Sequence, residues 1–336
     1  MSKVDDSKIS IIIPCLGGIE YIDELFDSLV NQTFKKFEII FVNSNCMESD
    51  QIEKKILQYS TLDIKIFPTL PLCPGDARNL GVLQANSSLL AFLDVRTIPY
   101  QDWLEKILEF KLKFNHDIVL GKFVCETDTR FQELVKSATF GNYPSDSLPG
   151  SMLSKDLFNN IGNFIHGARS GEDEEWLGRV QNSQYSIGRI DHAKLSYYGL
   201  PKSAADLAKK WFFYSIKSAP INVAQSQKGA YFFLLFLFFI YFFFNWNYIF
   251  TNDQWDESPY FIPHINKIVW SIFFFIYFFF RGFYMPSRRG VSKNFLFPYN
   301  WIKVSLIGLL IDLSKLPGRI LGYFYFIKIK LSNFNK

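Results

Sequence analysis

The sequence predicts an α/β protein with a mainly parallel sheet flanked by helices, followed by a C-terminal helical membrane hairpin. Short apolar runs alternate with amphipathic helices over the first part of the chain, which is typical of a parallel sheet buried on both faces. Two long Phe-rich runs follow residue 210, and 24 of the 37 Phe lie after that residue. Lys and Arg flank these runs while acids lie between them, as in a membrane hairpin.

Composition argues against several classes of protein. The net charge of +4 is too small to indicate a nucleic-acid partner. The chain has four cysteines, Cys15, Cys46, Cys73 and Cys125. They form no C-x-x-C pair and no Cys/His cluster, so we expect neither a zinc site nor a disulfide framework. Charged residues precede the first short apolar run, and Pro14 ends it, which does not fit a signal peptide.

The predicted strands are short apolar runs, and the helices between them carry one apolar face. The strands are expected at residues 9–13, 37–42, 63–67, 89–93 and 118–124. The helices are expected at residues 21–31, 50–59, 76–86 and 100–114. Strands that alternate with helices in this way predict a mainly parallel sheet.

The pattern loosens after residue 124. Residues 142–150 are rich in Pro, Ser and Gly and predict a loop, followed by a short strand at 151–153 and a helix at 155–161. Residues 162–171 are loop-like and contain His166 and Arg169. A helix is expected from residue 172, and another over 204–218.

An acid and a base follow the strand at 89–93. Asp94 and Arg96 would lie beyond its carboxyl end, where ligands bind in open α/β sheets. The pair could hold a polar, charged ligand. The alternative is an Asp that caps the next helix beside a solvated Arg.

Four consecutive acids, Glu172 to Glu175, open a predicted helix. Acids are common at helix N-termini because of the helix dipole, which is the simple explanation. Four exceed what a dipole requires, and Trp176 with Leu177 implies that one side of the helix faces protein. One of these acids could therefore act as a general base.

The sequence contains two apolar runs, at residues 231–244 and 268–280. Each run reaches the length of a membrane span only if the flanking residues, some of which are polar, are included. We expect spans at about 230–250 and 266–285. Two buried core helices are the alternative. Lys and Arg flank the pair on both sides, whereas Asp253, Asp256 and Glu257 lie between, which predicts cytoplasmic flanks and an external loop.

Two further segments are expected near the membrane. The helix at 204–218 is basic and amphipathic, which indicates either a membrane surface or a helix that closes the domain. Residues 300–330 are expected to form interfacial helices, with a third span as the alternative. The predicted organisation is thus a cytoplasmic domain at 1–218 and a membrane region at 219–336, in a multi-pass protein of the inner or cytoplasmic membrane.

Four motifs occur in order between residues 7 and 218. They are Ile11-Ile12-Ile13-Pro14, Asn31-Gln32-Thr33 with the strand at 37–42, Ala77-Arg78-Asn79-Leu80-Gly81 with Phe92-Leu93-Asp94, and Gly171-Glu172-Asp173. Together they resemble the family 2 glycosyltransferases of the GT-A fold. The last motif is similar to the ED motif, whose Asp is the catalytic base of that family.

The resemblance implies roles for particular residues. Asp173 would be the base, beside Glu172. The expected nucleotide-sugar ligands are Pro14, Asn43, Ser44, Arg78, Asn79, Asp94 and Arg96. The residues expected on the acceptor side are His166, Arg169 and Trp176.

The chain departs from the family pattern at the D-x-D motif. The motif is here Asp94-Val95-Arg96, and the second acid normally holds the divalent metal, Mn²⁺ or Mg²⁺. Asp94 would be the remaining metal ligand. Arg96 cannot ligate a metal, but its two-pronged fork can neutralise a diphosphate. A bound divalent metal is therefore doubtful. A second departure is that Asn43 and Ser44 follow the second strand, where the family usually has acids.

The resemblance implies an inverting enzyme that moves a sugar from a nucleotide-sugar donor to a membrane-associated, lipid-linked or glycan acceptor, with membrane lipids as neighbours. Two alternatives remain. A polyprenyl-phosphate glycosyltransferase has a phosphate acceptor that needs little base, which Glu172-Asp173 argues against. A non-catalytic relative would bind sugar nucleotides or act as a scaffold, which Asp94 and Asp173 argue against.

Overall fold

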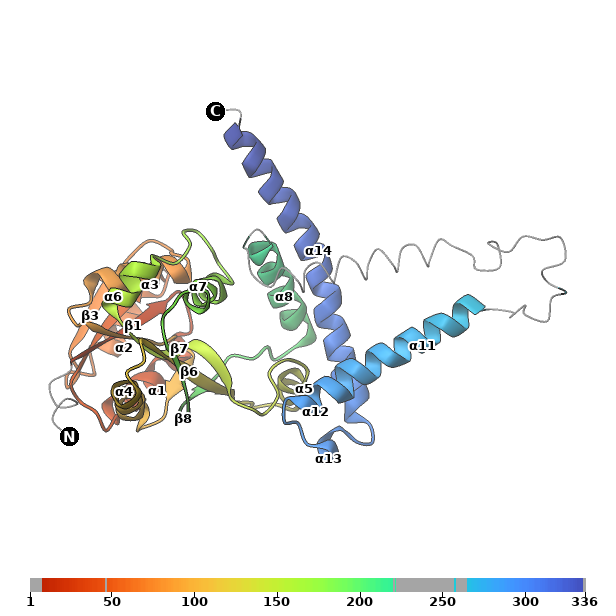
Figure 1. Cartoon of the computed structure of the whole chain (residues 1–336), viewed down its shortest axis with the longest axis horizontal. Coiled ribbons are helices and arrows are strands. Elements are labelled where there is room, and N and C mark those ends of the chain that lie inside the picture. Colours follow the sequence, from red (N-terminus) through yellow and green to blue (C-terminus); the bar gives the residue numbers. More distant parts are fainter. Residues whose placement is uncertain (1–7, 46, 220, 222–256, 258–264, 335–336) are drawn as a thin grey trace.

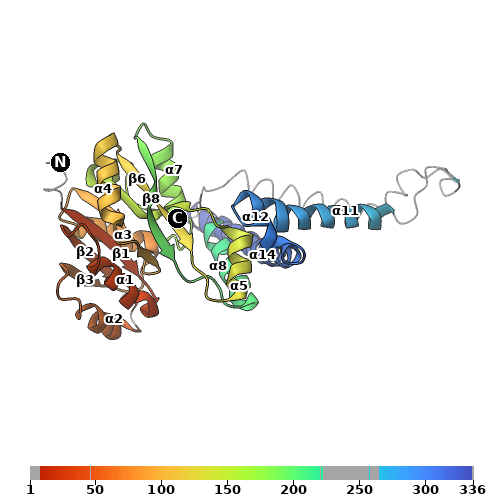
Figure 2. The same cartoon turned by 90° about the horizontal axis from the view of Figure 1, so that it is seen from below.

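The computed structural model describes residues 8–45, 47–219, 221, 257 and 265–334. An eight-stranded mixed sheet with the order β3-β2-β1-β4-β7-β6-β8-β5 forms the N-terminal part. Helices cover this sheet, and the helices of the C-terminal part lie beside one end of it (Figure 1). Helix α11 points away from the sheet in both Figure 1 and Figure 2.

The first half of the sheet confirms the expected parallel strands. They are β1 (Ile9–Cys15), β2 (Phe37–Asn43), β3 (Ile64–Pro68) and β4 (Leu89–Phe92). Strand β1 pairs in parallel with both β2 and β4, and β2 pairs in parallel with β3. The helices between them are α1 (Ile22–Val30), α2 (Ser49–Ile56) and α3 (Pro74–Gln84). The carboxyl ends of β1, β2 and β4 therefore meet at one edge of the sheet.

The second half of the sheet, with the helices around it, contains expected elements, and also two strands and one helix that the sequence did not predict: residues 97–99, 187–197 and 130–139. Its members are β5 (Thr97–Pro99), α4 (Trp103–Phe114), β6 (Ile118–Cys125), α5 (Arg130–Thr139), β7 (Ser145–Ser154), α6 (Lys155–Ile161), α7 (Glu172–Gln181), β8 (Ile187–Tyr197) and α8 (Ala204–Ser218). The loop expected at 142–150 was wrong over most of its length. Strand β7 runs through it, because antiparallel pairing of Ser145–Ser147 with β6, and of Met152–Ser154 with β4 and β6, satisfies much of its backbone.

Two apolar clusters cover the two faces of the sheet. Residues of α1, α2 and α4 pack on one face, with the Trp103 side chain fully buried. Residues of α3, α6 and α7 pack on the other, around the Trp176 side chain. Strands buried on both faces explain the unbroken apolar runs in the sequence.

The C-terminal part is helical over its described residues. It comprises α11 (Ile265–Phe279), a π-helical turn at Phe280–Tyr284, α12 (Met285–Arg288), α13 (Lys293–Leu296) and the long α14 (Asn300–Phe334). Within the described residues, Ile268–Arg288 is the one helical stretch long and apolar enough to cross a membrane. The other predicted span, at about 230–250, lies outside the described residues, so the two-span hairpin stays a prediction.

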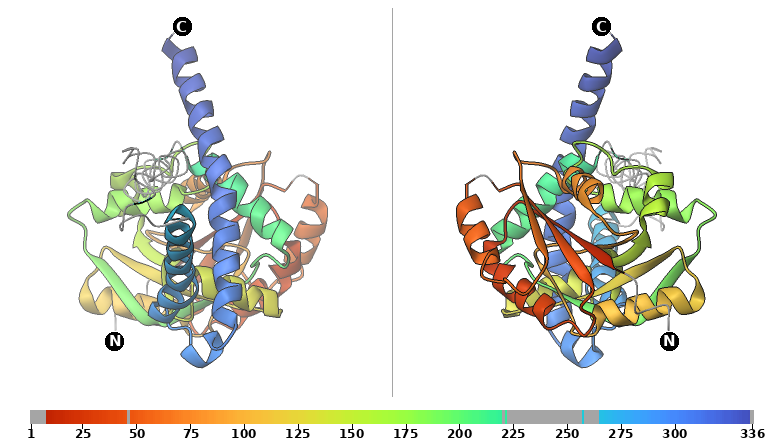
Figure 3. Two further views of the ribbon diagram at one scale, coloured as in Figure 1. Left: turned by 90° about the vertical axis from the view of Figure 1, so that its right-hand side faces the viewer. Right: turned by 90° about the vertical axis from the view of Figure 1, so that its left-hand side faces the viewer.

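A third apolar cluster joins the sheet to the C-terminal helices. It combines Cys125 of β6, Val135 of α5 and Leu207 of α8 with Leu296 of α13 and Val304 of α14. Figure 3 shows α14 passing beside α8 and extending beyond the rest of the chain. Residues on both sides of the predicted boundary at 218 therefore share one core.

Candidate functional site

The site is built around Asp94, which follows β4. The Thr97 side chain holds this turn: its hydroxyl accepts a hydrogen bond from the Asp94 backbone N–H at 2.9 Å and donates one to the Asp94 carbonyl at 2.7 Å. Thr97 is buried, so the turn is fixed from within the protein. The carboxylate of Asp94 is consequently held at the carboxyl edge of the sheet, as the sequence predicted.

Arg78 of α3 connects Asp94 to the acidic helix α7. Its Nη2 lies 2.7 Å from Asp94 Oδ1, and its Nη1 lies 3.0 Å from Glu172 Oε1. The Arg78 side chain is 3 % exposed and lies 5.7 Å from the centre of the Phe164 ring. Burial alone would lower the pKa of Arg78, but the neighbouring carboxylates outweigh it and raise the pKa above its usual value. A permanently charged guanidinium thus links Asp94, which is 16 positions away in the sequence, with Glu172, which is 94 positions away.

The two residues of the Glu-Asp motif differ in their surroundings. Glu172 is buried, which raises the pKa of its carboxyl, although the charge of Arg78 opposes this effect. Asp173 is partly exposed, and its Oδ1 accepts a hydrogen bond from the backbone N–H of Glu174. Glu172 is therefore engaged in an ion pair, while Asp173 keeps an oxygen open to an incoming group.

Helix α8 contributes residues that the sequence analysis did not assign to the site. The Ser170 hydroxyl donates to the Tyr214 carbonyl at 3.1 Å, which fixes α8 next to the start of α7. The pKa of the Tyr214 phenol is raised, first by burial and then by the negative charges of Glu172, Asp94 and Asp173. Tyr214 thus lies near enough to these three carboxylates for their charges to act on it, and it is 49 % exposed. No local pattern around Tyr214 gives this position, because it depends on how α8 docks.

The predicted ligands after β1 and β2 lie at the same edge of the sheet. Pro14 pairs with Val42 near the ends of β1 and β2. The Asn43 side chain donates to Ser49 Oγ at 2.9 Å, and the Ser44 hydroxyl lies 2.9 Å from Thr69 Oγ1. Both Asn43 and Ser44 are buried and tie neighbouring loops together. Their contact with a nucleotide stays a prediction.

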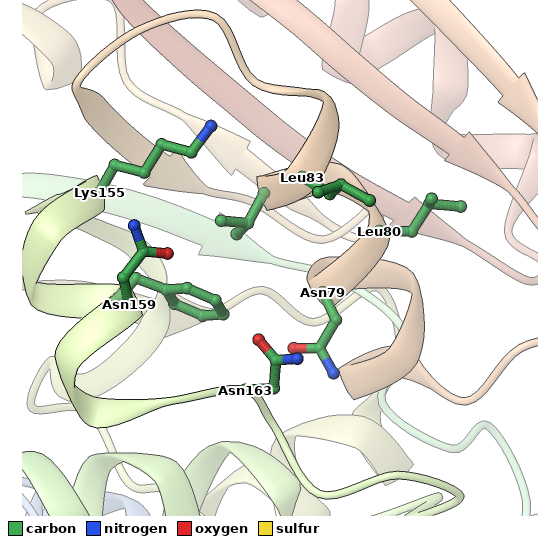
Figure 4. A pocket seen from close by; sticks show the side chains of 8 residues that line it. Asn79, Leu80, Leu83, Lys155, Asn159 and Asn163 are labelled. Atoms are coloured by element: carbon green, nitrogen blue, oxygen red, sulfur yellow. The ribbon is translucent and has the colours of Figure 1, made fainter.

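Asn79 has a structural partner. Its side-chain N–H donates to the Phe164 carbonyl at 3.0 Å, and its oxygen accepts from the Phe164 N–H at 2.9 Å. Asn79 also lines a hollow between α3 and α6 (Figure 4), together with Leu80, Val82, Leu83, Lys155, Phe158, Asn159 and Asn163. None of the other predicted site residues lines this hollow. The observed role of Asn79 is thus to hold the loop that precedes α7, and donor binding by Asn79 stays a prediction.

The three residues assigned to the acceptor side have different positions. His166 is exposed, and its Nδ1 lies 2.8 Å from Asp76 Oδ1. Arg169 is exposed, so both residues stay candidates. The assignment of Trp176 was wrong, because its side chain is fully buried and its indole N–H donates to the Gly162 carbonyl at 2.8 Å.

Taken together, the site has a basic side and an acidic side. Arg96 follows Asp94, while Glu172 and Asp173 lie across Arg78. One open carboxylate can accept a proton, and nearby basic groups can stabilise a developing negative charge. Group transfer to an acceptor hydroxyl uses these two features.

Comparison with known proteins agrees with this geometry. Residues 10–174 match the model of Glycosyl transferase family 2. This region is a family 2 glycosyltransferase domain. The match contains Asp94, Arg78, Glu172 and Asp173, which are the residues that the site brings together.

Several curated glycosyltransferases are similar to this domain. An uncharacterized glycosyltransferase of Rickettsia conorii is 35% identical over 199 residues, which are 56% of this chain and 32% of that protein. Glycosyltransferase AglE of Haloferax volcanii is 24% identical over 197 residues, which are 53% of this chain and 63% of that protein. The chain thus spans about a third of the length of the first relative and less than two thirds of the second.

Among solved structures, residues 1–349 of TarS from S. aureus are similar with a TM-score of 0.46 and 19% identity. The likeness covers 65% of this chain and 66% of that one. A mixed sheet flanked by helices, like that of GT-A enzymes, is the fold of the family 2 domain described above.

Proposed function

We propose that the chain is an inverting glycosyltransferase that moves a sugar from a nucleotide-sugar donor to a lipid-linked glycan at the cytoplasmic face of a membrane. The observation that carries the proposal is the buried Arg78 bridge. It fixes Glu172, and with it the adjacent Asp173, relative to Asp94 at the donor edge of the sheet. A base held at a set place beside the donor is what direct displacement requires.

In the proposed reaction, Asp173 accepts the proton of an acceptor hydroxyl. The acceptor oxygen forms a bond to the anomeric carbon, and the bond from that carbon to the diphosphate oxygen breaks on the opposite face. The electron pair of the broken bond leaves with the nucleoside diphosphate. Positive groups near Asp94 stabilise the charge that gathers on this leaving group.

Two observations support a lipid-linked acceptor. A relative from Escherichia coli, 27% identical over 152 residues (41% of this chain and 59% of that protein), is named UDP-Glc:alpha-D-GlcNAc-diphosphoundecaprenol beta-1,3-glucosyltransferase. The described residues also contain one helical stretch, Ile268–Arg288, apolar enough to enter a bilayer, and many of its Phe side chains are exposed. A membrane would keep a lipid-linked acceptor at high local concentration near the site.

The test compares Asp173→Asn with Glu174→Gln. The first change keeps the shape of the side chain and removes its basicity, so transfer should fall by roughly 10²-fold or more. Glu174 is exposed and adjacent, so the second variant should transfer at the rate of the unchanged protein. The measurement is incorporation of labelled sugar into the lipid extract of membranes supplied with UDP-, GDP- and dTDP-sugars.

Other outcomes would decide between the alternatives. Full activity of Asp173→Asn would show that Asp173 is not the base. It would favour a polyprenyl-phosphate acceptor, which needs no proton acceptor. Donor binding without transfer or donor hydrolysis in the unchanged protein would indicate a non-catalytic relative.

A further inference from the structure

The backbone of Arg96 is fixed in the turn between β4 and β5. Its carbonyl accepts a hydrogen bond from the Tyr198 N–H at 2.9 Å, and the adjacent Val95 and Thr97 are buried. Arg96 therefore occupies a defined position two residues after Asp94, where the family D-x-D motif has its second acid.

The Arg96 side chain lies in a cradle of small and aromatic residues. Its guanidinium carbon is 5.8 Å from the centre of the Tyr21 ring. A Cβ built on Gly199 would come within 2.8 Å of Arg96 Cδ and 3.0 Å of its Nη1, and Gly199 has a φ of +96°. Only glycine accepts this conformation and this contact without strain. The side chain is thus packed against Gly199 instead of being free in solvent.

Lys210 of α8 brings a second positive charge to the same edge of the sheet. Thr97 pairs with Tyr197, and Tyr197 pairs with Cys125, so the three residues lie side by side across β5, β8 and β6. Leu207, one helical turn before Lys210, packs in the same cluster as Cys125 of β6, and Lys210 is close enough to Arg96 for the charge of Arg96 to act on it. Burial, and then the like charge of Arg96, lower the pKa of Lys210 to about 8.

Within the part of the chain that the structure describes, no acid pairs with either cation. Among the described residues, Arg96 and Lys210 form no ion pair with a carboxylate, whereas Arg78 has two such partners. Holding two like charges together without an acid costs free energy, which an anionic ligand would recover.

The donor atoms at this place do not suit a divalent metal. Asp94 Oδ1 already faces the Arg78 guanidinium at 2.7 Å, and Arg96 offers only N–H donors. The described residues include no group of three or more His, Cys, Asp or Glu that could hold a metal ion. We therefore expect the positive charge at this site to come from the Arg96 and Lys210 side chains.

We propose that Arg96 and Lys210 together bind the diphosphate of the donor in place of a divalent metal, an inference that rests on the proposed function. The Arg96 fork can contact two phosphate oxygens at once, and Lys210 adds a point charge. Both charges are in place before the sugar leaves, so they stabilise the departing diphosphate without rearrangement.

The test measures binding of nucleoside diphosphates to the purified full chain in detergent. UDP, GDP, dTDP, CDP and ADP are titrated by calorimetry, once with EDTA and once with Mn²⁺. At least one should bind in EDTA, with an affinity that Mn²⁺ changes less than threefold. Arg96→Ala and Lys210→Met should each weaken that binding at least tenfold, and Arg96→Lys should restore part of it.

Lys209→Met is the matched control, because Lys209 is the exposed neighbour of Lys210 on the same helix. It should bind like the unchanged protein. Affinity should also fall as the pH rises above about 8, because Lys210 then loses the proton that the phosphate needs; the groups that act on Lys210 are Arg96 and Cys125. Thermal unfolding of each unliganded variant shows that it is folded.

The outcomes separate this inference from the proposed function. Binding that appears only with Mn²⁺ would overturn the dibasic site and leave a metal-dependent glycosyltransferase. Binding in EDTA that survives both Arg96→Ala and Lys210→Met would also overturn it. If no nucleoside diphosphate bound under either condition, donor binding itself would fail, and the proposed function with it.

Discussion

At the scale of single residues, Arg78 has the largest structural role in the site. Its guanidinium is buried between Asp94 and Glu172, so three charged groups share one small volume. Such a group contributes little net stability when complete, because the cost of removing charges from water offsets their attraction. Its main effect is to fix where the two carboxylates lie.

Removal of Arg78 should therefore destabilise the protein strongly. In Arg78→Met the carboxylate of Glu172, with its side chain 6 % exposed, would be buried without a partner, and we expect a loss of about 3 kcal/mol in the free energy of unfolding. Arg189→Met is the control, because Arg189 pairs with Asp146 near the surface, and it should cost less than about 1 kcal/mol. Chemical unfolding of the detergent-solubilised chain measures both.

The loss caused by Arg78→Met should depend on pH. Burial already raises the pKa of Glu172. Without Arg78, nothing opposes the rise that burial causes in the pKa of Glu172. The Glu172 carboxylate therefore takes up a proton as the pH falls, and its unpaired negative charge disappears. The loss should thus be smaller at pH 5 than at pH 8, and an equal loss at both values would contradict the burial argument.

Part of this site could be predicted from sequence. Asp94 and the Glu-Asp pair were found because each follows a recognisable local pattern, a strand end or a helix start. The contact from Arg78 to Glu172 spans 94 positions and leaves no such pattern. For Lys210 and Tyr214 the sequence indicates only a helix at a membrane surface or one that closes the domain, because their place near the site depends on the docking of α8.

At the scale of elements, helices α8 and α14 pack with their backbones in close contact. A Cβ on Gly318 would lie 2.5 Å from the Phe212 carbonyl oxygen, and one on Gly322 would lie 2.5 Å from both Ala219 Cβ and the Ile216 carbonyl oxygen. The Lys315 ammonium also lies 4.2 Å from the centre of the Trp211 ring. The position of α8, and therefore of Lys210, depends on α14.

Gly318→Ala should force α8 and α14 apart and lower the melting temperature by several degrees, since the added methyl group meets backbone atoms that cannot rotate away. Gly178→Ala is the matched helix substitution, because nothing lies within 4 Å of its Cβ position. The free energy of unfolding of Gly178→Ala should increase by about 0.5–1 kcal/mol. Equal melting temperatures for the two variants would contradict the close packing.

The elements themselves were predictable where apolar periodicity is strong. Strands β1 to β4 and helix α8 were expected close to their observed bounds. Strand β7 was missed because Ser, Pro and Gly signal a loop, yet pairing with β4 and β6 overrides that signal. Strand β8 was missed because its polar residues obscure the alternation, and helix α5 begins at a capping box, Thr129 to Gln132, that was not used.

At the scale of the whole molecule, the charge pattern predicts that the loop between the apolar runs is external. A cysteine in place of Asp256 should be labelled by an impermeant maleimide added to intact cells. A cysteine in place of Asn294, which is exposed and follows the second run, should be labelled only after lysis. The unchanged chain serves as the blank, and labelling of the Asp256 site only after lysis would refute this topology.

The third apolar cluster has a consequence for synthesis. The first two clusters use residues up to Tyr198, so they can assemble while the C-terminal helices are still being made. The cluster around Leu207 also needs Leu296, Val304 and Ile311. The ribosome must therefore release the start of α14 before α5 and α8 are fully packed. The newly made enzyme therefore acquires its complete site only after the start of α14 has emerged, which delays activity until the C-terminal helices have been made.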